Sequence, residues 1–236
     1  MCEAIRCLKG HDYTGLTTTY NANPTDKNVD GVAMQDFTQI SQELITAGRQ
    51  LYAQGLVPAT SGNFSARLDD GSIAITVSGR HKGKLIEEDI MRIDADGGLL
   101  DGRKSSAETL LHVYLYRRYP EARVVLHPHS VNATLLSRLC DEWLVLQDYE
   151  LLKAFPGIAS HDCTVHVPVF DNDQNIARLA QKVDACLAGL DSAHGYLIRG
   201  HGFYTWGVTT EDALRHVEAF EFLFECELRL RSLQNK

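Results

Sequence analysis

The pattern of apolar and polar positions divides the chain into an unpatterned first segment and a regularly patterned remainder. Residues 1–33 are polar, rich in Thr and Asn, and show no periodicity, so we predict a flexible N-terminal extension there. From residue 34 to the C-terminus, apolar residues recur at spacings typical of helices and strands. We therefore expect a single folded domain over residues 34–236.

Apolar residues spaced three or four apart predict several helices in this patterned part. Asp36 is a suitable N-cap for a first helix that runs to about Gln54, and Gly55 ends its pattern. Further helices are predicted over residues 106–118, 130–140, 149–155, 173–190 and 209–233. Each of them can bury one apolar face against a sheet.

Short apolar or alternating runs predict strands between these helices. The stretch NFSARLDDGSIAITVSG indicates a hairpin that turns at residues 69–71, and GYLIRGHGFYTWG indicates two strands around a glycine turn. Further strands are predicted within EEDIMRIDADGGLL and over residues 124–127, 143–147 and 163–170. Pro168 lacks a donor for a neighbouring strand, which favours an edge or the end of a strand. Because hairpins outnumber β-α-β units, we expect a mostly antiparallel sheet with helices packed on it.

Charge and composition argue against several kinds of partner. The formal net charge of −8 disfavours nucleic acid and anionic membrane surfaces. No apolar stretch reaches the ~20 residues of a membrane span, and the N-terminus shows no signal-peptide pattern, so we expect a cytoplasmic protein. The six cysteines include no Cys-x-x-Cys pair, which favours reduced thiols.

Three histidines stand at positions that suit a metal ion. His127 and His129 are two residues apart at the end of an apolar strand, so their rings project from the same face. His201 lies between two glycines after another strand, where the backbone can turn tightly. Three neutral imidazoles predict a zinc site with one open coordination position, as catalytic zinc sites have. The other histidines, among them His112, are expected in the core or at the surface, which is also the alternative for these three.

Three segments rich in Ser and Gly have the chemistry of an anion cradle. Each lies at the boundary of a predicted element: TSGNF (60–64), SGRHKGK (78–84) and KSSAE (104–108). Ser105 and Ser106 stand at the start of a predicted helix, where free N–H groups and the helix dipole favour an anion. Hydroxyl groups, Asn63 and a nearby Lys or Arg would complete a phosphate site. The alternative is that these segments are ordinary turns and that Ser105 and Glu108 form a capping box.

Taken together, these motifs resemble those of the class II aldolase/adducin family. Five of them occur in the order and spacing of that family: GLVPATSGNFSARL, SGRHKGKL, KSSAETLLHVYLYRRYP, VVLHPHS and IRGHGFYTWG. The resemblance covers about residues 34–236 and implies a three-layer α/β/α fold around a mostly antiparallel sheet. It also implies one zinc ion per subunit, held by His127, His129 and His201. Homotetramers with sites near the subunit interfaces are common in the family, so a neighbouring subunit is expected to contribute residues.

The resemblance also implies an activity for this site. A phosphate group would bind to a set of small polar residues and glycines: Ser61, Gly62, Asn63, Ser78, Gly79, Ser105 and Ser106. LVLQDYELLKAF and GHGFYTWG are similar to the family branch that dehydrates a methylthio keto-sugar phosphate in methionine salvage. In that comparison Glu150 matches the principal acid/base residue, whereas Glu108 matches a glutamate that assists it or lies near the metal.

Two other functions, and one simpler interpretation of Glu150, stay open. An aldolase or epimerase acting on a fuculose- or ribulose-type phosphate would use the same metal and phosphate residues. A non-catalytic adducin-like module would keep the fold without the metal ligands, but all three histidines and both glutamates are present. Glu150 is alternatively a solvated acid early in a short helix.

Overall fold

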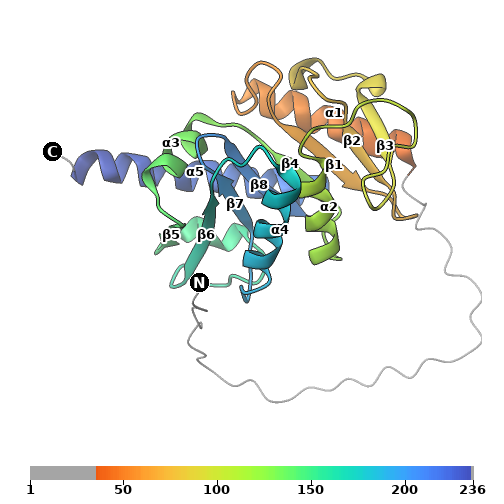
Figure 1. Cartoon of the computed structure of the whole chain (residues 1–236). Helices are drawn as coiled ribbons and strands as arrows, with labels where there is room; N and C mark the ends of the chain where they lie inside the picture. The colour runs from red at the N-terminus through yellow and green to blue at the C-terminus, as the bar shows by residue number, and fades with distance from the viewer. Residues whose placement is uncertain (1–35, 235–236) are drawn as a thin grey trace, which may run out of the picture.

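The computed structural model describes residues 36–234, which form an eight-stranded sheet with helices on both faces (Figure 1). The strands follow the order β3-β2-β1-β4-β8-β7-β6-β5 across the sheet. Their bounds are β1 Asn63–Arg67, β2 Ile73–Thr76, β3 Ile90–Ile93, β4 Val124–His127, β5 Trp143–Gln147, β6 Thr164–Phe170, β7 Gly195–Ile198 and β8 Gly202–Gly207. The extension predicted over residues 1–33 lies outside the described residues.

The sheet is mostly antiparallel, as predicted. β6 and β7 are the one parallel pair among the described strands, and the other neighbouring pairs are antiparallel. The edge position considered for Pro168 is wrong, because β6 lies between β5 and β7 and Pro168 is opposite Trp143 of β5. Pro168 does stand near the end of its strand, and the register with β7 begins only at Val169. The proline therefore lies outside the ladder that joins β6 to β7.

Helices cover both faces of the sheet and complete the predicted three layers. One apolar cluster joins α1, α3 and α5 to one face, and a second joins α2 and α4 to the other. The bounds are α1 Phe37–Ala53, α2 Thr109–Arg118, α3 Val131–Leu139, α4 Ile176–Leu187 and α5 Thr210–Gln234, with the short 3-10 helices η1 Lys82–Lys84, η2 Glu87–Asp89 and η3 Glu150–Ala154. Within residues 36–234, no helix has the length and apolar character needed to cross a bilayer.

Alternation along β4 decides which side chains face which helical layer. Val124 and Leu126 belong to the cluster with α1, α3 and α5, whereas Val125 belongs to the cluster with α2 and α4. His127 has the same parity as Val125, so its ring faces the layer that contains α2. Glu108 immediately precedes α2, and this parity is what allows the histidine and the glutamate to meet.

The start of α2 differs from the sequence prediction. The helix begins at Thr109 and not at residue 106, because Ser105 forms an isolated bridge with Val77 and keeps the chain extended. In place of a capping box between Ser105 and Glu108, the Glu108 N–H donates to Ser106 Oγ at 3.3 Å. The Glu108 carboxylate is thereby left free to face the histidines.

Candidate active site

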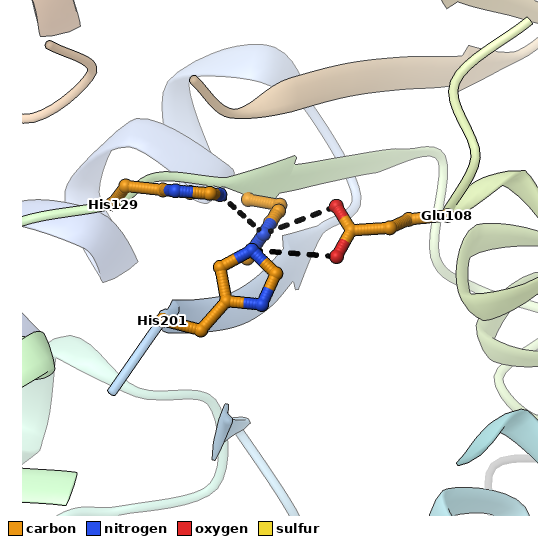
Figure 2. Close-up of side chains that lie close together, drawn as sticks. Glu108, His129 and His201 are labelled. Carbon is orange, nitrogen blue, oxygen red and sulfur yellow. Dashed lines mark hydrogen bonds and ion pairs between the residues drawn. The ribbon is translucent and has the colours of Figure 1, made fainter. Parts of the chain in front are cut away.

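Three imidazoles and one carboxylate converge at one end of the central strands. One ligand atom from each of His127, His129, His201 and Glu108 lies within 4.8 Å of the others. Figure 2 shows Glu108, His129 and His201 reaching this point from different sides. Glu108 Oε2 lies 3.3 Å from His127 Nε2, and Glu108 Oε1 lies 3.4 Å from His201 Nε2. The structure thus brings together the three histidines predicted as ligands and adds Glu108 as a fourth donor.

A backbone contact fixes His127 with one ring nitrogen free. His127 is fully buried at the end of β4, and its Nδ1–H donates to the Phe203 carbonyl at 2.8 Å. That hydrogen bond leaves Nε2 with a lone pair facing His129 and Glu108, which is the usual way that metal-binding histidines are oriented. His129 Nε2 lies only 2.8 Å from His127 Nε2, so the two nitrogens share either a proton or a cation.

The turn that carries His201 is held from several sides. The His201 N–H donates to the Ile198 carbonyl at 3.0 Å, and the His201 carbonyl accepts a hydrogen bond from Thr134 Oγ1 at 3.0 Å. Gly202 lies so close to the Pro128 carbonyl that any side chain would collide with it. Glycine at this position therefore allows the turn to approach the end of β4, where the other two histidines lie.

Burial keeps His129 and His201 neutral, while the Glu108 carboxylate stays ionised. Burial and the nearby His127 and His201 lower the pKa of His129 to about 2, and burial is also the main reason that the pKa of His201 is lowered. Burial alone would raise the pKa of Glu108, but its interactions with His127 and His201 and a hydrogen bond from Asn63 hold that pKa well below its usual range. Neutral imidazoles and an ionised carboxylate are the donor set of a divalent cation, so these residues fit a metal ion.

A cavity of about 290 Å³ adjoins this cluster and contains most of the predicted phosphate residues. Its walls include Ser61, Gly62, Asn63, Ser78, Gly79 and Ser106. Ser105, which forms the bridge with Val77, is not among them. The hydroxyl oxygen of Ser61 is buried without a partner among the described residues, so it is available to a ligand oxygen.

Strand pairing explains why the phosphate residues lie beside the histidines. β1 pairs with β4 so that Asn63 is opposite His127. Gly62 has a φ of 76°, and a Cβ at this position would lie 2.7 Å from the His127 carbonyl. Only glycine allows this backbone conformation and this close approach together.

Glu150 lies apart from the cluster in the single chain. It begins η3, its side chain is 73% exposed, and its carboxylate lies 2.6 Å from Lys153 Nζ and 3.8 Å from His161 Nδ1. The hydrogen bond from Lys153 is the main reason that the pKa of Glu150 is lowered. Glu150 does not line the cavity, so its catalytic role stays a prediction.

His112 is a site residue that sequence reasoning missed. It is fully buried in α2, its Nε2–H donates to Asn63 Oδ1, and its Nδ1 accepts a hydrogen bond from Ser65 Oγ at 2.7 Å. Asn63 Nδ2 in turn donates to Glu108 Oε2 at 2.6 Å. Burial lowers the pKa of His112 to about 3, so the ring is neutral and orients Asn63 toward the carboxylate. The sequence did contain one signal for this role: His112 follows Glu108 by four residues, so in a helix the two side chains lie on the same face.

The loop between β6 and α4, together with the first residue of α4, supplies another wall that no motif indicated. Asn172, Gln174 and Ile176 line the same cavity as the histidines. β6 runs parallel to β7, so the chain that follows β6 emerges at the same end of the sheet as the His201 turn. This placement depends on strand order and has no local signal in the sequence.

Comparisons with known proteins point to one family. The family model for the class II aldolase and adducin N-terminal domain matches residues 42–228. The chain is 61% identical over 199 residues to methylthioribulose-1-phosphate dehydratase of Methylococcus capsulatus, an alignment that covers 84% of this chain and 98% of that protein. It is 56% identical over 200 residues to the protein of the same name from Azotobacter vinelandii, covering 84% and 97% of the two chains.

A solved structure shows the same arrangement of elements. L-fuculose-1-phosphate aldolase from Thermus thermophilus superposes with a TM-score of 0.69 at 28% sequence identity. The superposition covers 85% of this chain and 100% of the aldolase chain. Fold, sequence and the candidate metal cluster therefore agree, and the chain belongs to the class II aldolase and adducin family.

Proposed function

We propose that this chain is a zinc-dependent dehydratase that converts 5-methylthioribulose 1-phosphate to 2,3-diketo-5-methylthiopentyl 1-phosphate in methionine salvage. The observation that carries the proposal is the convergence of three histidines and Glu108 beside a cavity lined by serines and glycines. Relatives that are identical at more than half of the aligned residues bear the dehydratase name, which supports this substrate. We further propose that the enzyme acts in the cytoplasm as a homotetramer.

The phosphate of such a substrate would bind where the Ser and Gly segments form the cavity wall. The buried Ser61 hydroxyl has no partner among the described residues, and Ser78 also offers its hydroxyl to the cavity. Gly62 and Gly79 leave their backbone open to a close ligand. Ser106 lies just before α2, where the helix dipole favours an anion.

His127, His129 and His201 would hold the zinc ion, with Glu108 beside them. When bound, zinc would supply Lewis-acid polarisation of the substrate ketone. The chain itself orients the His127 ring toward the zinc position, because His127 Nδ1–H donates to the Phe203 carbonyl at 2.8 Å. Because the pKa values of His129 and His201 are lowered, neither ring is an imidazolium that would first have to lose its charge when a cation binds.

Dehydration removes the proton on C3 and the hydroxyl group on C4 as one water molecule, and the resulting enol becomes the diketone. A base must reach C3 and an acid must reach the C4 oxygen. We propose Glu150 as the principal acid/base residue and Glu108 as the residue that assists it. Since Glu150 is exposed and does not line the cavity of its own chain, it would act in the cavity of a neighbouring subunit.

The test of this function joins metal analysis to a substrate assay on the purified full-length protein. We expect one zinc ion per subunit and formation of the diketone from 5-methylthioribulose 1-phosphate. Cleavage of fuculose 1-phosphate without diketone formation would replace the dehydratase with an aldolase, the activity named for the Thermus protein. A folded protein that holds no stoichiometric metal would favour the non-catalytic module.

A further inference from the structure

Lys82 is the one buried lysine among the described residues, with 1% of its surface exposed. It begins η1, and its ammonium group donates to the Arg80 carbonyl at 2.6 Å and to the Thr60 carbonyl at 3.2 Å. A buried ammonium is costly unless hydrogen bonds and charges compensate it. Its retention in the interior therefore calls for a specific role.

The two carbonyl groups that Lys82 contacts belong to separate phosphate segments. Thr60 lines the cavity together with Ser61, and Arg80 follows the cavity residues Ser78 and Gly79. One ammonium group thus joins two loops that are about 20 residues apart in the sequence, directly behind the cavity wall. Because the two loops share this contact, displacement of one would be transmitted to the other.

The backbone of η1 is itself fixed against α1. Gly48 of α1 lies close to the Lys82 carbonyl, and a Cβ on Gly48 would come within 2.9 Å of it. A Cβ on Gly83 would come still closer to the ring of Tyr52 in α1, so a side chain there would also collide. The Lys82 side chain consequently starts from a rigid base and reaches the two loops from a defined direction.

Lys82 supplies a positive charge close to a cavity wall that contributes none of its own among the described residues. Among residues 36–234, no Lys or Arg lines the cavity, although the proposed ligand carries a phosphate. Burial lowers the pKa of Lys82 to about 8, which leaves the ammonium mostly charged at pH 7, and Asp89 opposes that shift. Asp89 is also engaged by Arg80 at 3.1 Å and by the Ile86 N–H at 3.2 Å, so its charge is shared among several donors.

We propose that Lys82 is the positioning residue of the phosphate end of the cavity. Its ammonium holds the Thr60 and Arg80 loops together and places a positive charge behind an anion site whose described wall contains no cationic side chain. The proposal rests on the proposed function only in taking the anion to be the substrate phosphate. The binding of an anion can be measured without any turnover.

The main experiment titrates inorganic phosphate into zinc-loaded, full-length protein by calorimetry. Lys82→Met should raise the Kd for phosphate by about tenfold, as expected for the loss of one partly screened charge. The matched control is Lys84→Met, which removes an exposed lysine from the same short helix and should leave the Kd within about twofold of the wild type. Zinc content should be unchanged in both variants.

Three outcomes would overturn the proposal. One is a folded, zinc-loaded Lys82→Met that binds phosphate as tightly as the wild type, because Lys82 would then be only a structural tether. Another is equal weakening by Lys84→Met, which would indicate a general effect of surface charge. The third is wild-type protein that binds no phosphate, because there would then be no anion site to support.

A second measurement covers the case in which Lys82→Met does not fold. In wild-type protein with ¹³C-labelled lysine, NMR can follow the Lys82 side chain through a pH titration with and without saturating phosphate. Because linkage is reciprocal, a phosphate group that is favoured by the ammonium must raise the pKa of Lys82. An unchanged titration of Lys82 would contradict the proposal.

Kinetics separates this proposal from the proposed function. If the protein dehydrates its substrate, Lys82→Gln should raise KM more than it lowers kcat, because the chemistry occurs at the histidines and not at the phosphate. If it does not, the phosphate titration still tests Lys82 by itself. A fall in kcat with unchanged phosphate affinity would count against the proposed role.

Discussion

The two ends of the central strands both hold buried histidines, yet only one of them forms a candidate metal centre. His127, His129 and His201 meet where β4 ends and β8 begins. At the opposite end, His194 and His216 line a larger cavity, of about 740 Å³. Burial lowers the pKa of His194 to about 4 and also lowers the pKa of His216. Imidazoles whose pKa is lowered by burial are therefore present at both ends.

What differs is the direction of the ring nitrogens and the presence of a carboxylate. His194 stacks on Phe155 with ring centroids 4.9 Å apart, and His216 Nδ1–H donates to the Trp206 carbonyl at 2.7 Å. In the part of the chain that the structure describes, the Glu108 cluster is the one group of three or more metal-binding residue types whose ligand atoms meet. Convergence with a carboxylate, and not burial or cavity size, distinguishes the metal end.

The largest expected effect comes from removing one histidine at the metal end. His127→Ala should lose bound zinc and lower turnover by roughly 1,000-fold or more, since Lewis-acid stabilisation is worth several kcal/mol. His194→Phe is the matched change at the opposite end and should retain both zinc and activity. Metal analysis and the dehydration assay check this pair. Full zinc content in a folded His127→Ala would contradict the difference between the two ends, because the convergence of the three histidines with Glu108 would then not mark a metal site.

The next effect concerns the exposed carboxylate. Glu150→Gln should retain zinc and substrate binding but lower kcat by about 100-fold, as for other acid/base residues. Glu121→Gln changes an exposed acid that lines the larger cavity and should leave kcat near the wild-type value. Near-normal turnover in Glu150→Gln would transfer the principal acid/base role to Glu108. Steady-state kinetics with metal analysis decides between the two carboxylates.

A smaller effect is expected for the histidine that supports Glu108. His112→Phe removes the donor to Asn63 and should lower kcat by about 10-fold at unchanged fold, the lower end of what loss of such supporting contacts costs. His112→Gln retains a donor near the same place and should recover part of the activity. If Gln and Phe were equally active or equally impaired, His112 would be a packing residue, like the histidines at the other end.

The smallest effect is the pH dependence of stability, which both ends share. Folding lowers the pKa of His112 to about 3 and of His194 to about 4, so the unfolded chain takes up protons first as the pH falls below about 6.5. The contribution of these two histidines to the free energy of unfolding should therefore be constant above pH 6.5 and decrease below it, by roughly 1.4 kcal/mol per pH unit for each histidine.

Urea denaturation at pH 7.5 and pH 5.5 measures this dependence. His194→Phe removes one of the titrating groups, so its loss of stability between the two pH values should be smaller than that of the wild type. An equal loss in the variant and the wild type would show that His194 does not remain neutral in the folded protein.

Elements were predictable where their signals are local. The helix at Phe37–Ala53, the strand at Val124–His127 and the long helix at Thr210–Gln234 agree with the periodicity of their own residues. The start of α2 was predicted three residues too early, because a bridge to Val77, far away in the chain, keeps Ser105 extended. Contacts of that kind have no signal in the segment that they reshape.

By itself, the sequence determined the ligand types and their local directions. The strand that ends at His127 directs this ring and leaves His129 two residues further on, and the glycines beside His201 permit its turn, because backbone geometry is local. The tertiary structure alone decided which distant groups meet: Glu108 with the histidines, and Lys82 with two separate loops. The physical reason is that spacing along one element sets direction, whereas the register of β1 on β4 and the packing of helices on the sheet set distance.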